Sequence, residues 1–151
     1  MLIRDLIESN VVKVSKDTTW REALELMEEH DTNGIFVVDG HGKYLGAVTI
    51  ADLINFVVPP YMKENPDLAK SAGPGTFFEL CLAKQHVKVE KFMDKRRAFF
   101  RPNISLTEVV AASLGTDSYR IPVVDKEGKL VGVVNRRHIR EALGQRFKEQ
   151  P

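Results

Sequence analysis

Residues 34–53 read GIFVVDGHGKYLGAVTIADL, and residues 120–139 read RIPVVDKEGKLVGVVNRRHI. Aligned at an offset of 86 residues (132 − 46 = 86), the two stretches are identical at eight positions. In the numbering of the first stretch these are Ile35, Val37, Val38, Asp39, Gly42, Lys43, Gly46 and Val48. Average composition would give roughly one or two matches over this length by chance. The sequence therefore contains an internal duplication.

The same offset continues upstream of these stretches without a gap. TWREAL at 19–24 falls on SLTEVV at 105–110, and RDLIES at 4–9 falls near EKFMDK at 90–95. Residues 58–88 have no counterpart and separate the two copies. The duplication thus covers most of the chain.

Both copies predict the same order of elements: strand, helix, strand, strand, helix. The β-branched strings IFVVD and IPVVD predict strands, and each is followed by a Gly-containing turn and a second strand, as in a hairpin. A short apolar strand precedes the first helix of each copy, at 11–14 and at 98–100. We expect the second helix to begin near Ile50 in the first copy and near Arg136 in the second.

The first helix of each copy has a recognisable start. Thr19-x-x-Glu22 and Ser105-x-x-Glu108 have the form of a capping box. In that motif a hydroxyl accepts a hydrogen bond from a first-turn amide, and the Glu reaches back to the amide of the cap. Apolar residues at helical spacing follow both motifs, so each predicts an amphipathic helix.

We expect an α+β fold of two units, 1–57 and 89–147. A single unit of this length is close to the size at which one core is marginal, so the units are expected to pack on each other. Pseudo-twofold symmetry would then create two equivalent clefts. Residues 58–76 of the insert are rich in Pro and Gly and predict a loop, and 76–87 predict a short helix.

Composition narrows the class of function. The 151 residues carry 22 Lys and Arg against 21 Asp and Glu, a net charge of +1. That balance gives no general reason to expect a nucleic acid or an anionic membrane as partner. The N-terminus carries charges where a signal peptide would be apolar, and no apolar run is long enough to span a bilayer. With one cysteine and therefore no intrachain disulfide, we expect a soluble, cytoplasmic protein.

The duplicated unit, the string IPVVD-x-x-G-K-L-V-G-V-V and the step G-x-x-T-x-x-D resemble a tandem pair of CBS domains, also called a Bateman module. The resemblance covers nearly the whole chain apart from 58–88 and the last few residues. It implies a non-enzymatic regulatory module that often forms a homodimer and governs a partner protein. It also implies an adenosine-containing ligand, AMP, ADP or ATP first, with S-adenosylmethionine, NAD and cyclic di-AMP as alternatives.

Polar residues in GAVTIADL form the first candidate site. Thr49 stands where a strand ends and a helix begins, so the unsatisfied amides after it favour an anion such as phosphate. Asp52, one turn later, is placed to accept hydrogen bonds from a pair of hydroxyls such as those of ribose. Gly46 lacks a Cβ, which lets either a flat ring or another backbone approach closely.

The resemblance implies the same roles for Thr49 and Asp52, and it places the base against two strands. The residues implied there are Lys13, Val14, Gly34, Ile35 and Phe36. An alternative stays open, because Thr-x-x-Asp is also a capping box that needs no ligand.

The second copy changes the polar positions. The second candidate set is Asn135, Arg136, Arg137, His138, Arg120 and Ile121. Asn135 can still cap a helix, but His138 supplies no permanent negative charge to ribose hydroxyls. This cleft has therefore either lost nucleotide binding or changed its ligand. Its arginines would suit two phosphates, as in cyclic di-AMP, or they are ordinary solvated residues.

Three functions can be compared from the sequence: a nucleotide sensor, an interaction scaffold and an enzyme. A nucleotide sensor is favoured by the G-x-x-T-x-x-D step within the duplication, and a ligand-free interaction scaffold by Phe77, Phe78 and Leu80 in the insert. An enzyme has no positioned base or nucleophile to support it. We predict no catalytic cofactor and no metal, because the four histidines show no ligand spacing with one another or with Cys81. Cys81, between two leucines, is expected in the core.

Overall fold

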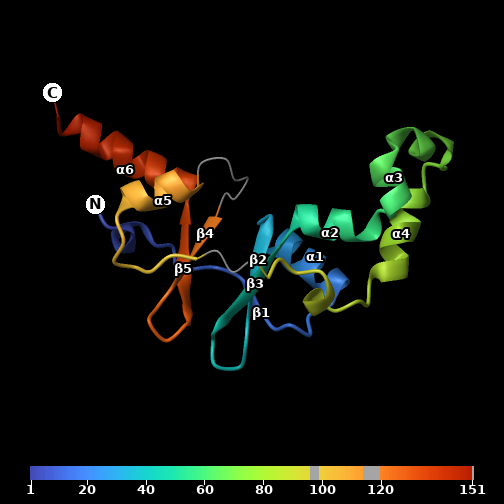
Figure 1. The fold of residues 1–151 in the computed structure, drawn as a ribbon, viewed down its shortest axis with the longest axis horizontal. Helices are drawn as coiled ribbons and strands as arrows, with labels where there is room; N and C mark the ends of the chain where they lie inside the picture. The colour runs from blue at the N-terminus through green and yellow to red at the C-terminus, as the bar shows by residue number, and fades with distance from the viewer. Residues whose placement is uncertain (96–98, 114–119, 151) are drawn as a thin grey trace. The chain divides into compact units, whose positions relative to one another are not determined.

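The computed structural model describes residues 1–95, 99–113 and 120–150, and the chain divides into two compact units (Figure 1). Unit 1 comprises Met1–Val11, Val38–Tyr44 and Arg96–Pro151, and unit 2 comprises Val12–Val37 and Leu45–Lys95. The units do not follow the sequence repeats. Met1–Val11, the leading segment of the first repeat, packs in unit 1 with the second hairpin, and 89–95, the leading segment of the second repeat, packs in unit 2 with the strands of the first repeat.

Unit 2 is built on a three-stranded sheet in the order β1-β2-β3. Its strands are β1 (Lys13–Val14), β2 (Gly34–Val38) and β3 (Tyr44–Thr49), and its first two helices are α1 (Trp20–Glu29) and α2 (Ile50–Val57). Strand β1 runs parallel to β2, with Lys13 opposite Phe36. The predicted order of strand, helix, strand, strand, helix is confirmed here.

The capping motifs of the first helices form mainly through their hydroxyls. Thr19 accepts a hydrogen bond from the Glu22 amide at 3.2 Å, and Ser105 accepts one from the Glu108 amide at 3.2 Å. The Glu22 carboxylate, however, accepts from the Thr19 hydroxyl at 3.0 Å and does not reach the cap amide as a full capping box requires. The sequence located both helix starts correctly.

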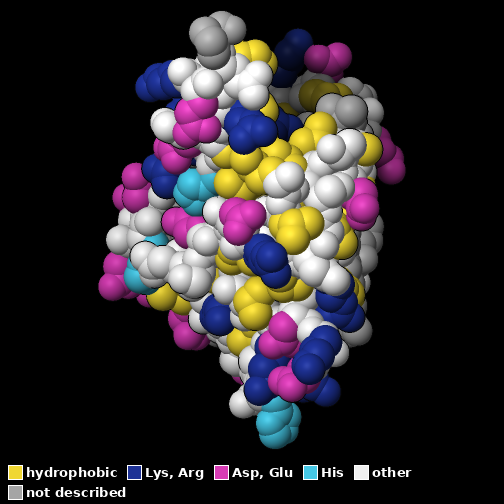
Figure 2. All heavy atoms as spheres, turned by 90° about the vertical axis from the view of Figure 1, so that its left-hand side faces the viewer, with side chains coloured by type: hydrophobic (Ala, Val, Ile, Leu, Met, Phe, Trp, Pro, Cys, Tyr) yellow, Lys and Arg dark blue, Asp and Glu magenta, His cyan; other side chains and the backbone are white. Residues whose placement is uncertain are grey.

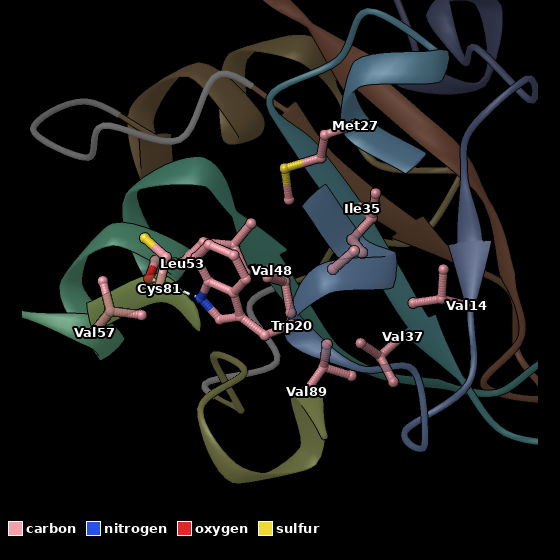
Figure 3. Packing of buried hydrophobic residues seen from close by; sticks show 11 residues of the cluster. Val14, Trp20, Met27, Ile35, Val37, Val48, Leu53, Val57, Cys81 and Val89 are labelled. Carbon is pink, nitrogen blue, oxygen red and sulfur yellow. Dashed lines mark hydrogen bonds between the residues drawn. The ribbon is translucent and has the colours of Figure 1, made fainter. Parts of the chain in front are cut away.

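The core of unit 2 is organised around Trp20, whose indole N–H donates to the Leu53 carbonyl at 3.0 Å (Figure 3). This bond joins α1 to α2 and satisfies the polar end of a buried aromatic ring. Cys81 lies in the same cluster, as predicted, and burial raises the pKa of its thiol. The cysteine is therefore a packing residue with a suppressed thiolate.

The insert is more regular than the sequence suggested. It forms α3 (Pro60–Glu64), the 3-10 helix η2 (Pro66–Ser71) and α4 (Thr76–Lys84), which Figure 1 shows beyond the end of α2. The prediction of a loop over 58–76 was therefore wrong. Pro60 and Pro66 each occupy a first helical position, where a proline ring pre-sets the backbone and no amide is needed. The predicted helix at 76–87 is confirmed by α4.

Unit 1 contains the second hairpin, β4 (Arg120–Val124) and β5 (Leu130–Asn135), with helices α5 (Leu106–Ser113) and α6 (Arg136–Lys148). Phe100 forms a parallel bridge to Val123, which corresponds to the pairing of Val14 with Val37 in unit 2 at the offset of the duplication. Ala98 of the expected strand 98–100 lies outside the described residues. The described part of the second repeat keeps the pairing of the first.

The hairpin turns use an aspartate in the same way. Asp39 accepts hydrogen bonds from the amides of His41 and Lys43, and Asp125 accepts from those of Glu127 and Lys129. The bond from the Lys43 amide, followed by that from the His41 amide, lowers the pKa of Asp39. These residues are turn formers, a role typical of Asp at the start of a turn.

Short 3-10 helices, η1 (Ile3–Leu6) and η3 (Val89–Lys91), lead to a backbone bridge in each unit. In unit 1, Glu8 exchanges two hydrogen bonds with Val133 at 2.8 and 2.9 Å. In unit 2, Asp94 exchanges two with Ala47 at 2.9 and 3.1 Å. Each bridge adds a short stretch of chain beside the second strand of a hairpin and so covers its edge.

Each bridge depends on a glycine. A Cβ on Gly46 would lie 2.5 Å from the Asp94 carbonyl oxygen, and one on Gly132 would collide with the Glu8 carbonyl. A backbone atom cannot move aside, as the tip of a flexible side chain can. These two glycines therefore allow the leading segment to pair with the strand.

We expect Gly46→Ala and Gly132→Ala each to lower the free energy of unfolding by about 1–3 kcal/mol, because the added methyl group meets backbone. Urea denaturation followed by circular dichroism measures this. Gly144→Ala in α6 is the control: its Cβ meets nothing within 4 Å, and it should raise stability by about 0.5–1 kcal/mol. A loss at Gly144 equal to that at Gly46 would contradict the backbone contact.

Candidate functional site

The first candidate site lies at the start of α2 in unit 2. The Asp52 amide donates to the Thr49 hydroxyl at 3.2 Å, and the Thr49 amide donates to the Asp52 carboxylate at 2.8 Å. These are the two reciprocal bonds of a full capping box. The structural role that the sequence left open is thus present. Thr49 is exposed and Asp52 half-buried, so a ligand can reach both.

The start of α2 is tied to the start of β2. The Ile50 amide donates to the Asn33 carbonyl at 2.9 Å, which places the Thr49 turn beside Gly34. On the other side of β2, the Phe36 amide donates to the Val12 carbonyl at 3.0 Å. The start of α2, strand β2 and strand β1 therefore lie side by side. Together they span about two strand spacings, or ~10 Å.

The residues assigned to the base differ in accessibility. Val14, Ile35 and Phe36 are buried, and the first two belong to the core cluster of unit 2. Lys13 is exposed and Gly34 half-buried at the same part of the sheet. Buried side chains can offer only an apolar wall, so polar contacts to a base here would come from the backbone.

Gly46 lies away from this group. It is buried against the backbone of Asp94, and the Ala47 amide donates to the Asp94 carbonyl at 3.1 Å. Of the two approaches that the sequence left open for Gly46, a flat ring or another backbone, the structure shows the backbone.

In unit 1, Asn135 caps α6 as predicted. Its side-chain oxygen accepts a hydrogen bond from the His138 amide at 2.9 Å. Its side-chain nitrogen donates to the Glu8 carboxylate at 3.1 Å. The cap thus has two partners, one of them an anion from the N-terminal segment.

His138, at the position of Asp52, has a different environment. Its Nδ1 is buried without a hydrogen-bond partner among the described residues, and its Nε2 lies 3.4 Å from a guanidinium nitrogen of Arg137. Arg137 also pairs with Glu141 at 3.7 Å. An imidazole in this setting provides no acidic group for ribose hydroxyls.

The other predicted residues of the second set lie close to the cap. Arg120 is paired with Asn135 across β4 and β5, and Ile121 is buried beside it on β4. Arg136 is exposed at the first position of α6. Sequence reasoning missed Glu8, although the offset that aligned RDLIES with EKFMDK pointed to that segment.

Metal sites and membrane-spanning helices each have recognisable features. Within 1–95, 99–113 and 120–150, no group of three His, Cys, Asp or Glu side chains could hold a metal ion. In the same residues, no helix has both the length and the apolar character needed to cross a membrane.

The two repeats match a known family model. The model described as CBS domain matches residues 3–59 and again residues 89–145. The chain belongs to the CBS domain family. The two matches establish a tandem CBS pair with an α+β fold, which confirms the fold class and the resemblance seen in the sequence.

Relatives of this CBS pair differ in length. MJ1426 of Methanocaldococcus jannaschii, an uncharacterized protein, is 26% identical over 159 residues, which cover 95% of this chain and 91% of the relative. CBSX2, a chloroplastic CBS domain-containing protein of Arabidopsis thaliana, is 27% identical, with 93% and 61% covered. For inosine-5'-monophosphate dehydrogenase of Aquifex aeolicus the identity is 30%, but the match covers 21% of that enzyme.

Two solved structures are similar over their whole length. CBSX2 in complex with AMP superposes with a TM-score of 0.72 at 25% identity, covering 95% of this chain and 96% of that one. The CBS pair of MJ0100, in complex with 5'-methylthioadenosine and S-adenosyl-L-methionine, gives 0.69 at 20% identity, covering 97% and 98%. Both neighbours are CBS pairs that hold adenosine-type ligands.

Because Thr49 caps α2, we expect Thr49→Ala to lower the free energy of unfolding by about 0.5–2 kcal/mol with no ligand added. Thermal or urea denaturation of the purified protein measures this. Asn55→Ala, an exposed position on the same helix, is the control and should change stability little. If Thr49→Ala were equally neutral, the capping box would not form in solution.

Proposed function

We propose that this CBS pair is a non-enzymatic regulatory module that binds AMP, ADP or ATP at the start of α2 and relays the signal to a partner protein in the cytoplasm. The observation that carries the proposal is the pairing of Thr49 with Asp52 at an accessible helix start beside β2. The AMP held by CBSX2, a CBS pair of the same fold, supports an adenosine ligand.

The capping box and the ligand site are compatible roles for Asp52. A carboxylate has about four lone-pair sites on two oxygens, and the Thr49 amide uses one of them through Oδ2. Ribose hydroxyls can therefore bind while the cap stays intact. The Thr49 hydroxyl, which already accepts from the Asp52 amide, keeps its own hydrogen to donate to a phosphate oxygen.

A regulatory effect requires that the ligand favour one of two states of the protein. The coupling free energy in such systems is about 1–3 kcal/mol. The product of a neighbouring gene is the first partner to test.

We also propose that the module forms a homodimer through α5 and α6. A groove of about 830 Å³ lies between these helices, lined by apolar residues that include Leu106, Val110, Ile139 and Leu143. Figure 2, which faces this end of unit 1, shows hydrophobic side chains gathered between charged ones. Leu143 is 48% exposed and Phe147 74% exposed. A second copy of the chain packed on α6 would remove this apolar surface from water.

We expect Leu143→Asp to convert a dimer into a monomer, because a carboxylate would be buried without a partner in the apolar interface. Light scattering coupled to size-exclusion chromatography measures the mass. Leu68→Asp, in the insert at 46% exposure, is the matched control and should remain dimeric. A monomeric wild type would refute the proposed dimer.

We expect a thermal-shift panel of AMP, ADP, ATP, S-adenosylmethionine, NADH and cyclic di-AMP to show stabilisation by an adenine nucleotide. A ligand at 100 times its dissociation constant adds about 2.7 kcal/mol to the free energy of unfolding.

We expect Asp52→Ala to weaken nucleotide binding by about 1.5–3 kcal/mol, since it removes a charged acceptor. His138→Ala should leave nucleotide affinity nearly unchanged in calorimetry. Equal losses from both substitutions would contradict the assignment to the first repeat.

A second candidate function rests on the insert. Phe77 is 49% exposed, Phe78 66% and Leu82 45%, which makes α4 apolar on its outer face. If no nucleotide changes the melting temperature, an interaction scaffold that binds a partner through 58–88 becomes the better proposal. A shift with cyclic di-AMP alone would instead favour a receptor for that dinucleotide, and turnover of any ligand would reopen the enzyme hypothesis.

A further inference from the structure

A carboxylate from the N-terminal segment occupies the cap of α6. The Asn135 side-chain nitrogen donates to Glu8 Oε2 at 3.1 Å, while its oxygen accepts from the His138 amide at 2.9 Å. Asn135 corresponds to Thr49, the residue that the proposed function assigns to a ligand phosphate. In unit 1 an internal anion therefore sits on the group that would face phosphate.

The backbone holds this carboxylate in place. Glu8 exchanges hydrogen bonds of 2.8 and 2.9 Å with Val133, two residues before Asn135, and Gly132 leaves room for the Glu8 carbonyl. The side chain therefore projects from a fixed position, and only its own rotamer freedom is lost when it binds the cap. Such pre-organisation makes an internal anion an effective competitor of a free one.

The first repeat is arranged differently at the equivalent positions. Asp94, which occupies the place of Glu8, has a side chain one methylene shorter, and the Thr49 amide is bound by Asp52 of its own helix. In unit 1 the residue at the position of Asp52 is His138, which has no carboxylate. The acidic group at the helix start thus comes from α2 itself in unit 2 and from the leading segment in unit 1.

The surroundings of Glu8 add to its effect on anions. Asp5, Glu8 and Glu141 line a pocket of about 340 Å³ together with His138. Arg137 is paired with Glu141 at 3.7 Å, which reduces the positive charge it offers. A phosphate entering here would meet carboxylates at short range, where like charges repel.

We propose that Glu8 closes the second repeat to phosphate-bearing ligands, so that each chain binds a single nucleotide, at the start of α2. The stoichiometry rests on the proposed function, but the closure of the α6 cap by Glu8 does not. Glu8 is a specificity-determining residue: its carboxylate occupies the cap in place of a ligand anion. Removal of that side chain, with the backbone bridge retained, opens the cap to phosphate.

The test compares Glu8→Ala with Asp5→Ala, which removes an equal charge from the same segment without touching Asn135. Backbone amide shifts at the start of α6 are followed by ¹H–¹⁵N NMR during titration with inorganic pyrophosphate. We expect Glu8→Ala to bind pyrophosphate at least about tenfold more tightly than wild type or Asp5→Ala, because it frees the Asn135 side chain that Glu8 occupies, whereas Asp5→Ala removes only a like charge from the surrounding pocket. Urea denaturation verifies that each variant is folded, and Glu8→Gln is the substitute if Glu8→Ala is not.

Calorimetry with ATP then measures stoichiometry. One ATP site per wild-type chain, together with the gain of pyrophosphate binding in Glu8→Ala, supports the proposal. Two sites in wild type, or no gain of pyrophosphate binding in the Glu8 variant, would overturn it. Absence of nucleotide binding in wild type would refute the proposed function alone, since the pyrophosphate titration still decides whether Glu8 closes the cap.

Discussion

Each unit is completed by the leading segment of the other repeat. That segment pairs with the second strand of the hairpin, next to a glycine of that strand. Glu8 pairs with Val133 in unit 1, and Asp94 pairs with Ala47 in unit 2. Neither pairing tolerates a side chain on Gly132 or Gly46. In unit 1 the bridge also brings Glu8 to the start of α6, so the candidate site there depends on the bridge as much as on the hairpin.

This arrangement lets a duplicated fold diverge at its candidate sites without losing local stability. Each second helix needs a cap, and both Thr49 and Asn135 supply one. The fold does not require a particular second hydrogen-bond partner for either capping residue. In unit 2 the partner is Asp52 on the same helix, and in unit 1 it is Glu8 from the leading segment. One copy is left accessible while the other carries an internal anion.

Packing decides which of the candidate residues are covered and which stay exposed. Gly46 was a candidate for the ligand site, yet a backbone covers it. Cys81 lies in a core organised by the Trp20–Leu53 hydrogen bond, where burial suppresses its thiolate. Phe77 and Phe78, by contrast, stay exposed on the same helix, α4. Exposure rather than chemistry separates these residues.

The sequence by itself determined the duplication, the order of elements, the helix starts and the family. Periodicity, capping motifs and the repeat offset are local or regularly spaced signals, so they can be read without a structure. The regularity of 58–76 was missed, since prolines that open helices also mark loops. Only the tertiary structure decided that Gly46 faces a backbone, that Thr49 and Asp52 form a complete capping box, and that Glu8 binds Asn135. Glu8 and Asn135 are 127 residues apart. Such contacts depend on how each leading segment packs in the unit of the other repeat, which no local pattern encodes.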